Sequence, residues 1–190
     1  MDLKGSQTEK NILAAFAGES QARMRYSYFA SVAKKEGYEQ ISAIFQETSD
    51  NEREHAKLYF MLLEGGDAQV TASYPAGMIG TTAANLLAAA EGEKLEWSTL
   101  YPGFAVVADK EGFSIAAHTF REIAKVEEHH EQRYRKLLAN VSKGSVFKKS
   151  GIKSWKCRNC GYVHLDISAP DKCPVCDHPQ AYYELWCENY

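Results

Sequence analysis

The chain has 190 residues, of which 45% are hydrophobic, and its formal net charge is −3 at pH 7. This length suits one mid-sized domain, or one domain with a small module. Charges of both signs are interspersed, which excludes the basic footprint of a nucleic-acid-binding protein. The apolar runs are too short to span a membrane, and the polar N-terminal stretch MDLKGSQTEK lacks the apolar core of a signal peptide. We therefore expect a soluble, cytoplasmic protein.

Apolar residues at helical spacing predict four long helices before about Ser142. The first opens at a capping-box pattern, SQTE (6–9), and ends at an EGY break (36–38). The second ends at Gly65-Gly66. A loop of about a dozen residues follows, which is long for neighbouring helices and predicts a crossover connection.

The third helix contains Pro102, which should kink or locally disturb it, and it ends at an EGF break (111–113). The fourth helix follows this break. We therefore predict a mainly α fold, a four-helix bundle with a long crossover, over residues 1–146.

The two halves of the predicted bundle repeat each other. The stretch KEGY (35–38) matches KEGF (110–113) at an offset of 75 residues. The same offset pairs Glu52-x-x-His55 with Glu127-x-x-His130. This pattern indicates an internal duplication of one helix hairpin.

Each apolar stripe continues through one or more polar residues. Steps of three and four residues place seven such side chains on the inward faces of the helices. They are Glu19, Glu52, His55, Glu93, Glu96, Glu127 and His130. Unpaired buried carboxylates are very costly, so a converging set needs cations. Carboxylate oxygens mixed with imidazole suit iron or manganese.

A single Glu-x-x-His motif on a helix is usually polar surface. Two copies at the repeat offset, with partner glutamates on the other helices, instead predict the dimetal carboxylate site of ferritin-like bundles. Glu128 and His129 fall off the stripe and should face water. Four tyrosines lie near the site by spacing: Tyr26, Tyr59, Tyr101 and Tyr134. Some should be plain core residues, and we expect Tyr26 and Tyr101 to donate hydrogen bonds to ligating carboxylates.

All five cysteines follow Trp155. Cys157-x-x-Cys160 and Cys173-x-x-Cys176 form two metal knuckles, and four thiolates suit tetrahedral iron or zinc, between which the spacing does not choose. Cys187 lies outside the pairs and is expected to be a spare thiol. The basic, small-residue stretch 147–152 is interpreted as a linker, and residues 153–190 as the metal module.

The sequence resembles rubrerythrin over essentially its whole length. The resemblance rests on AGESQAR, EREHAK, PAGMI, WKCRNCGYVH and CPVC. It implies a ferritin-like diiron bundle followed by a small rubredoxin-like iron-binding β/loop domain, and hence three iron ions per chain, although zinc can misload. It further implies diiron ligation by Glu19, Glu52, Glu93, Glu96, Glu127 and His130. His55 would exchange with Glu96 as the redox state changes, and Cys157, Cys160, Cys173 and Cys176 would hold one iron.

The resemblance also implies a function, the reduction of hydrogen peroxide to water as protection against oxidative stress. Electrons would come from an NAD(P)H-linked reductase or a rubredoxin, because the chain has no G-x-G-x-x-G stretch of its own. His130 and Val141 are about 16 Å apart along a helix, so we expect the module to serve the bundle of a partner in a head-to-tail homodimer or larger assembly. Iron storage and a zinc-binding, non-enzymatic protein remain as alternatives.

Overall fold

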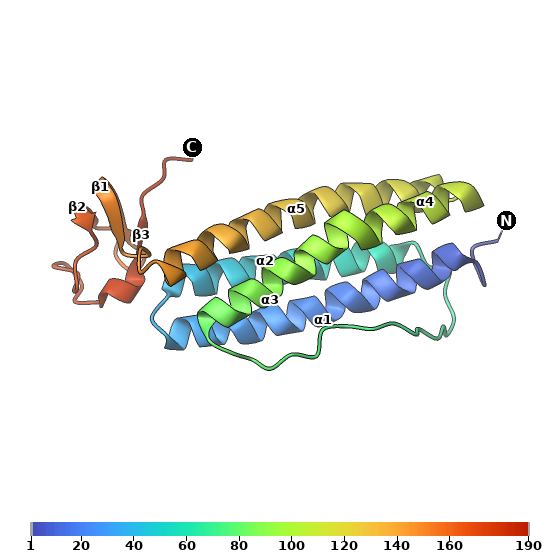
Figure 1. Cartoon of the computed structure of the whole chain (residues 1–190), viewed down its shortest axis with the longest axis horizontal. Helices are drawn as coiled ribbons and strands as arrows, with labels where there is room; N and C mark the ends of the chain where they lie inside the picture. The colour runs from blue at the N-terminus through green and yellow to red at the C-terminus, as the bar shows by residue number, and fades with distance from the viewer. Residues whose placement is uncertain (1, 190) are drawn as a thin grey trace.

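A computed structural model describes residues 2–189 as a long helical bundle with a small β domain at one end (Figure 1). The helices are α1 (Gln7–Lys35), α2 (Glu39–Met61), α3 (Thr82–Leu95), α4 (Tyr101–Glu111) and α5 (Ser114–Ser142). Because α3 and α4 continue each other, the bundle has four rods, and the predicted fold class is confirmed. Among the described residues, no helix is both long and apolar enough to cross a membrane.

The crossover between the two hairpins is longer than the sequence suggested. Helix α2 ends at Met61, before the predicted Gly65-Gly66. The N–H groups of Leu62 and Leu63 bond to carbonyls only three residues back, a tightening that commonly ends a helix. The chain then runs along α1 without regular structure until α3 begins at Thr82 (Figure 1).

The repeated KEGY and KEGF stretches join the two hairpins. Glu111 accepts hydrogen bonds from Thr8 N (2.8 Å), Thr8 Oγ1 (2.6 Å) and Gln7 N (3.2 Å) at the start of α1. In the other hairpin, Glu36 accepts a bond from Thr82 N (3.0 Å) at the start of α3. Each repeated glutamate thus satisfies free N–H groups at the positive end of a helix in the opposite hairpin.

Two apolar clusters fill the bundle, one on each side of a polar centre. The first gathers around Tyr59, Tyr101 and Phe120, and the second around Phe45 and Tyr134. Along α2 and α5, the Glu-x-x-His motifs lie between residues of the two clusters. The core therefore shields the polar centre from water at both ends.

The C-terminal domain is a three-stranded antiparallel sheet in the order β2-β1-β3. Its strands are β1 (Lys148–Cys157), β2 (Val163–Ser168) and β3 (Tyr183–Leu185). Residues 148–152, expected as linker, belong to β1, although the pairing with β2 is irregular between Lys148 and Lys153. Residues 148–152 show no strand pattern in the sequence. Their place in β1 depends on pairing with β2, in which Lys148 lies opposite Ser168.

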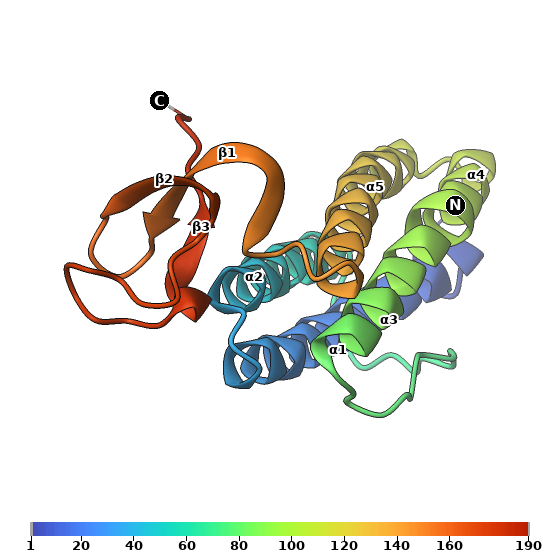
Figure 2. The ribbon, with the colours of Figure 1, turned by 60° about the vertical axis from the view of Figure 1, so that its left-hand side comes forward.

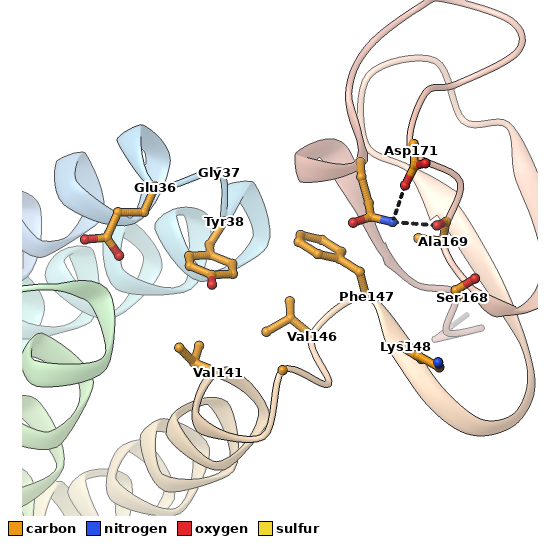
Figure 3. Close-up of a pocket in the computed structure, with 12 residues that line it drawn as sticks. Glu36, Gly37, Tyr38, Val141, Val146, Phe147, Lys148, Ser168, Ala169 and Asp171 are labelled. Atoms are coloured by element: carbon orange, nitrogen blue, oxygen red, sulfur yellow. Dashed lines mark hydrogen bonds between the residues drawn. The ribbon is translucent and has the colours of Figure 1, made fainter.

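The domain meets the bundle near the start of α2 (Figure 2). The rings of Tyr38 and Phe147 stack, with centroids 6.1 Å apart and planes inclined by 11°. They border a cavity of about 420 Å³ between the two parts, which Figure 3 shows. On the β-domain side of the cavity, the amide of Gln180 donates to the carbonyl of Ala169 at 2.6 Å. The β domain therefore lies beyond the end of the bundle.

Candidate metal centres

Six of the seven expected side chains meet in the middle of the bundle. Two groups of four have potential ligand atoms within 4.8 Å of one another. They are Glu19, Glu52, His55 and Glu127, and Glu52, Glu93, Glu127 and His130. Glu52 and Glu127 belong to both groups, and all six residues are buried. This geometry provides two adjacent sites that share two carboxylates.

Each histidine turns the same ring nitrogen toward the shared carboxylates. Nδ1 of His55 lies 2.7 Å from Glu52 Oε2 and 2.9 Å from Glu127 Oε1. Nδ1 of His130 lies 2.8 Å from Glu127 Oε2 and 3.2 Å from Glu52 Oε1. The two ring planes are inclined by only 29°, so the histidines flank the shared carboxylates similarly.

Burial and close charges shift the acidity of the cluster strongly. Burial opposes charge on the imidazoles, but the carboxylates of Glu127 and Glu52 outweigh it and raise the pKa of His55 to about 10. The same contest raises the pKa of His130 to about 12. Burial, followed by the charges of Glu52 and Glu127, raises the pKa of Glu93 to about 8. Without cations, the cluster therefore balances its carboxylates with protons.

The cluster leaves buried polar atoms without well-aligned hydrogen bonds. They are Glu19 Oε2, Glu52 Oε1, Glu93 Oε2, both carboxylate oxygens of Glu127, and His130 Nδ1. Such atoms are costly unless a partner satisfies them. Five hard oxygens and an imidazole nitrogen fit a pair of iron ions. The residues present therefore fit a dimetal site.

Two tyrosines orient the outer glutamates. Tyr26 donates to Glu93 Oε1 at 2.5 Å, and Tyr101 donates to Glu19 Oε1. In both glutamates the other oxygen, Oε2, is the one left without a partner. Burial, followed by the charge of the bonded glutamate, raises the pKa of both tyrosines, so they remain donors. Each glutamate can thus offer one free oxygen to a metal.

Glu96 lies apart from both ligand groups. It is half-buried and opens a π-helix (Glu96–Leu100), in which Tyr101 N bonds to the carbonyl of Glu96, five residues back. Regular α-helical spacing from Glu93 predicts that Glu96 shares its inward face, but the wider π turn changes this direction. Pro102 contributes, because it has no N–H to continue the α-helical pattern. The expected disturbance therefore takes the form of a π-helix.

The π-helix also explains a shift in the internal repeat. Before it, Glu19 matches Glu93 at an offset of 74, and after it Tyr26 matches Tyr101 at an offset of 75. One extra residue therefore lies in the π-helix, beside Glu96. The change of offset can be seen in the sequence and indicates an irregular helix at this point. The prediction for Glu96 instead assumed regular helical spacing.

Trp97 and Glu131 are neighbours of the site that spacing arguments missed. The indole Nε1 of Trp97 donates to Glu131 Oε2 at 2.6 Å, and Arg135 Nε donates to Glu131 Oε1 at 2.6 Å. Glu131 is only 8% exposed and directly follows His130. These contacts fasten the π-helix to α5. Glu128 and His129 are exposed, in line with the spacing.

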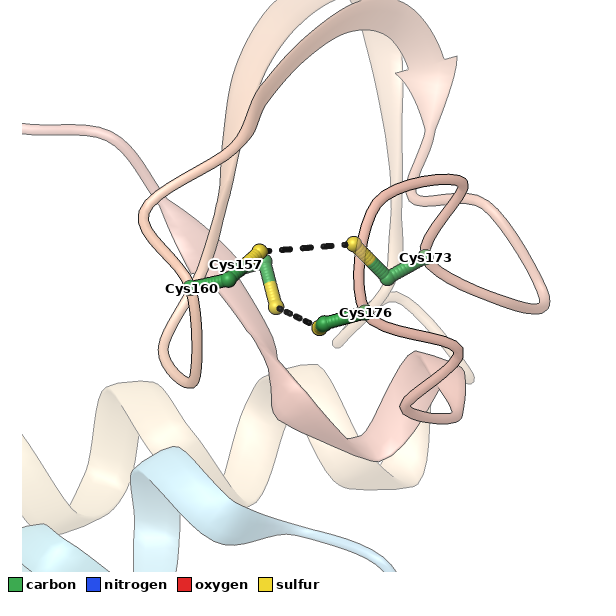
Figure 4. Close-up of side chains that lie close together, drawn as sticks. All are labelled: Cys157, Cys160, Cys173 and Cys176. Atoms are coloured by element: carbon green, nitrogen blue, oxygen red, sulfur yellow. Dashed lines mark hydrogen bonds between the residues drawn. The ribbon is translucent and has the colours of Figure 1, made fainter.

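The second centre lies in the β domain (Figure 4). Cys157, Cys160, Cys173 and Cys176 form one group, with Sγ–Sγ distances of 3.7 Å in the pairs 157–176 and 160–173. These distances are too long for disulfides and suit four thiolates around one ion. Hydrogen bonds, chiefly from the backbone of His178, lower the pKa of the Cys176 thiol to about 6. Cys187 is exposed and outside the group.

Comparisons with known proteins match both parts of the chain. A family model described as rubrerythrin matches residues 10–138, and one described as the rubredoxin-like domain of rubrerythrin matches residues 155–184. Rubrerythrin from Porphyromonas gingivalis is 60% identical over 188 residues, which cover 99% of this chain and 94% of that protein.

Solved structures agree with this assignment. Nigerythrin in its fully reduced, all-ferrous state aligns with a TM-score of 0.64 and 31% identity, over 96% of this chain and 91% of that one. A bacterioferritin from Mycobacterium tuberculosis, 18% identical with a TM-score of 0.61, aligns over 72% of this chain and 86% of its own length and shows the ferritin-like fold alone. The chain therefore belongs to the rubrerythrin family, with a carboxylate- and histidine-lined diiron site in its bundle and a rubredoxin-like four-cysteine site in its C-terminal domain.

Proposed function

We propose that this protein is a non-haem diiron peroxidase that reduces hydrogen peroxide to water and protects the cytoplasm against oxidative stress. The observation that carries the proposal is the pair of ligand groups that share Glu52 and Glu127. When bound there, two ferrous ions supply the two electrons that peroxide needs, whereas one ion supplies only one and yields hydroxyl radical. Family membership supports the same assignment.

Each residue of the cluster has a proposed role. Glu52 and Glu127 would serve both metal ions, Glu19 and His55 would complete the ligands of one, and Glu93 and His130 would complete those of the other. Four carboxylates balance two ferrous ions. Oxidation adds two positive charges, so the anionic Glu96 would replace the neutral His55 in the oxidised protein.

Glu96 is also a proposed source of a proton. Burial, followed by the charges of Glu93, Glu127 and Glu52, raises the pKa of Glu96 well above its usual value. Without metal ions, burial and these charges therefore favour the protonated carboxyl. Glu96 would have to give up this proton to serve as an anionic ligand. Arg25, which favours the ionised form of Glu96, limits the cost of that loss.

The four-cysteine iron is proposed to return electrons to the bundle one at a time. It accepts them from an NAD(P)H-linked reductase or a separate rubredoxin. The β domain lies beyond the end of α5, whose stretch from His130 to Val141 alone is about 16 Å long. We therefore propose that it serves the bundle of a partner chain in a head-to-tail homodimer or larger assembly.

Replacement of Glu96 tests the chemistry. Glu96→Ala should slow peroxide turnover far more than it lowers iron loading, as measured by stopped-flow oxidation of the reduced protein together with metal analysis. The exposed Glu128→Ala is the matched control and should change neither. Unchanged turnover in Glu96→Ala would contradict the proposed exchange.

The assembly is tested separately. A variant that is monomeric by analytical ultracentrifugation should retain peroxide-driven oxidation of its diiron site but lose most NAD(P)H-coupled turnover. Full coupled activity in a monomer would reject electron transfer between chains.

A further inference from the structure

A second cavity lies beside the diiron site, under the crossover loop. Its volume is about 310 Å³, at the small end of the range for ligand pockets. Helix α1, the crossover residues 72–75 and the rod formed by α3 and α4 enclose it. Glu96 and Tyr101 line the cavity, and Tyr101 also donates to Glu19 of the metal cluster. The cavity and the cluster therefore share a wall.

The cavity has two chemically different parts. Its polar groups include Gln21, Arg25 and Glu96, and Arg25 Nε donates to Gln21 Oε1 at 2.6 Å. The remaining lining is largely apolar, and includes Ala14, Ala15, Pro75, Leu95, Leu100 and Phe104. Hydrogen peroxide has no apolar part to place against these walls. A molecule with one polar end and a small hydrocarbon group matches both parts.

Two helical glycines keep this space open. Gly18 and Gly92 both line the cavity, although glycine weakens a helix relative to alanine. A Cβ atom added to Gly18 would lie 3.6 Å from Tyr74 Cε1, and one added to Gly92 would lie 3.7 Å from Arg25 Nη2. Both are ordinary contact distances, so close packing does not require a glycine at either position. The two glycines have in common that a larger side chain at either position would occupy part of the cavity.

The crossover loop covers the cavity through Tyr74. The hydroxyl of Tyr74 donates to the carbonyl of Ala14 at 2.9 Å, and its ring lies against Gly18. Residues 64–79 of the loop, Tyr74 included, are exposed and without regular structure. The hydrogen bond from Tyr74 therefore ties the cover to α1.

We propose that the cavity binds the hydrocarbon part of a small organic hydroperoxide and directs its O–O group toward Glu96 and Tyr101. The inference rests on the proposed peroxidase function and extends its substrates from hydrogen peroxide to organic hydroperoxides. In the reaction the O–O bond breaks. The substrate takes two electrons from the reduced diiron site and two protons, and leaves as one alcohol and one water.

Cumene hydroperoxide is the probe for turnover by the iron-loaded protein. The wild-type chain should reduce it, and Gly18→Leu should lower its kcat/KM, relative to that for hydrogen peroxide, by at least about tenfold. Gly103→Leu is the matched control, because Gly103 is a helical glycine on the exposed side of α4. It should leave the ratio unchanged. Turnover of hydrogen peroxide without any turnover of cumene hydroperoxide, or equal losses for both peroxides in Gly18→Leu, would overturn the proposal.

Binding of the product alcohol, 2-phenyl-2-propanol, tests the cavity without the reaction. Saturation-transfer NMR on the iron-free chain should detect binding to the wild type and to Gly103→Leu, and no binding to Gly18→Leu. Ala14→Leu fills the same cavity from a second position, should Gly18→Leu fail to fold. No binding to the wild type, or undiminished binding to the cavity-filling variant, would overturn the pocket. Intact binding to a wild-type chain that reduces no peroxide would support the pocket and reject the peroxidase function.

Discussion

Loading the bundle with ferrous iron should release protons, because the iron-free cluster holds protons where metals would bind. Nearby carboxylates raise the pKa of His55 to about 10 and of His130 to about 12 despite burial. Burial and neighbouring charges raise the pKa of Glu93 to about 8 and that of Glu19 well above its usual value. Metal ligands must be deprotonated, so these protons leave when iron binds.

The size of the effect follows from the number of protonated ligands. At pH 7, the two imidazolium groups and the Glu93 carboxyl hold protons, so iron binding should release about three protons per chain. Because the protonated forms stabilise the iron-free site, iron affinity must fall as the pH falls. With three protons released, the apparent binding constant should change by about 10³ per pH unit between pH 6 and pH 7.

The assay is an anaerobic titration of weakly buffered protein with ferrous iron, followed by a pH-indicator dye. The four-cysteine site must be filled first, because its thiols also lose protons on metal binding. Glu93→Gln should release one proton fewer, since an amide has none to lose. Release of one proton or none by the wild-type chain would show that the ligands are already ionised and would refute the reasoning.

Three further predictions follow from single contacts. Glu127→Ala should weaken iron binding in the bundle at least about tenfold, because Glu127 belongs to both ligand groups, whereas the exposed Glu128→Ala should leave iron content unchanged. Glu111→Gln should lower the thermal midpoint by roughly 2–4 °C, because it weakens the cap at Thr8. The hydrogen bonds from Thr8 lower the pKa of Glu111 in the folded protein. The difference in thermal midpoint between the wild type and Glu111→Gln should therefore be complete above the ordinary glutamate pKa, and it should vanish as the pH falls through the lowered pKa of the folded protein. Cys160→Ser should remove the iron of the β domain, by metal analysis and visible absorption, and leave the iron of the bundle in place.

Local spacing was sufficient to predict most of the two centres. Along a regular helix, steps of three and four residues return to the same face, so Glu52, His55, Glu127 and His130 could be assigned inward positions without knowledge of their neighbours. Two Cys-x-x-Cys pairs likewise indicate a four-thiolate site, because each pair brings two thiolates to one ion. The structure gathers both sets as these spacings suggest.

The position of Glu96 required the tertiary structure. Its three-residue step from Glu93 predicts a shared face only if the helix is regular, and the π-helix makes it irregular. The contact between Trp97 and Glu131 joins residues 34 positions apart, and no local pattern predicts such a pair. The capping of α1 by Glu111 is likewise non-local, although the repeated KEG stretch marked the residue in advance.

The sequence by itself determined the four helical rods, most of the residues that face their common axis and the ligand types of both metal centres, because these depend on helical period and residue type. Tertiary structure alone decided which carboxylate stands outside the cluster, how the hairpins cap each other and how a loop and two glycines enclose a cavity beside the metals. These features depend on contacts between segments far apart in the chain, whose geometry is fixed only when the helices pack.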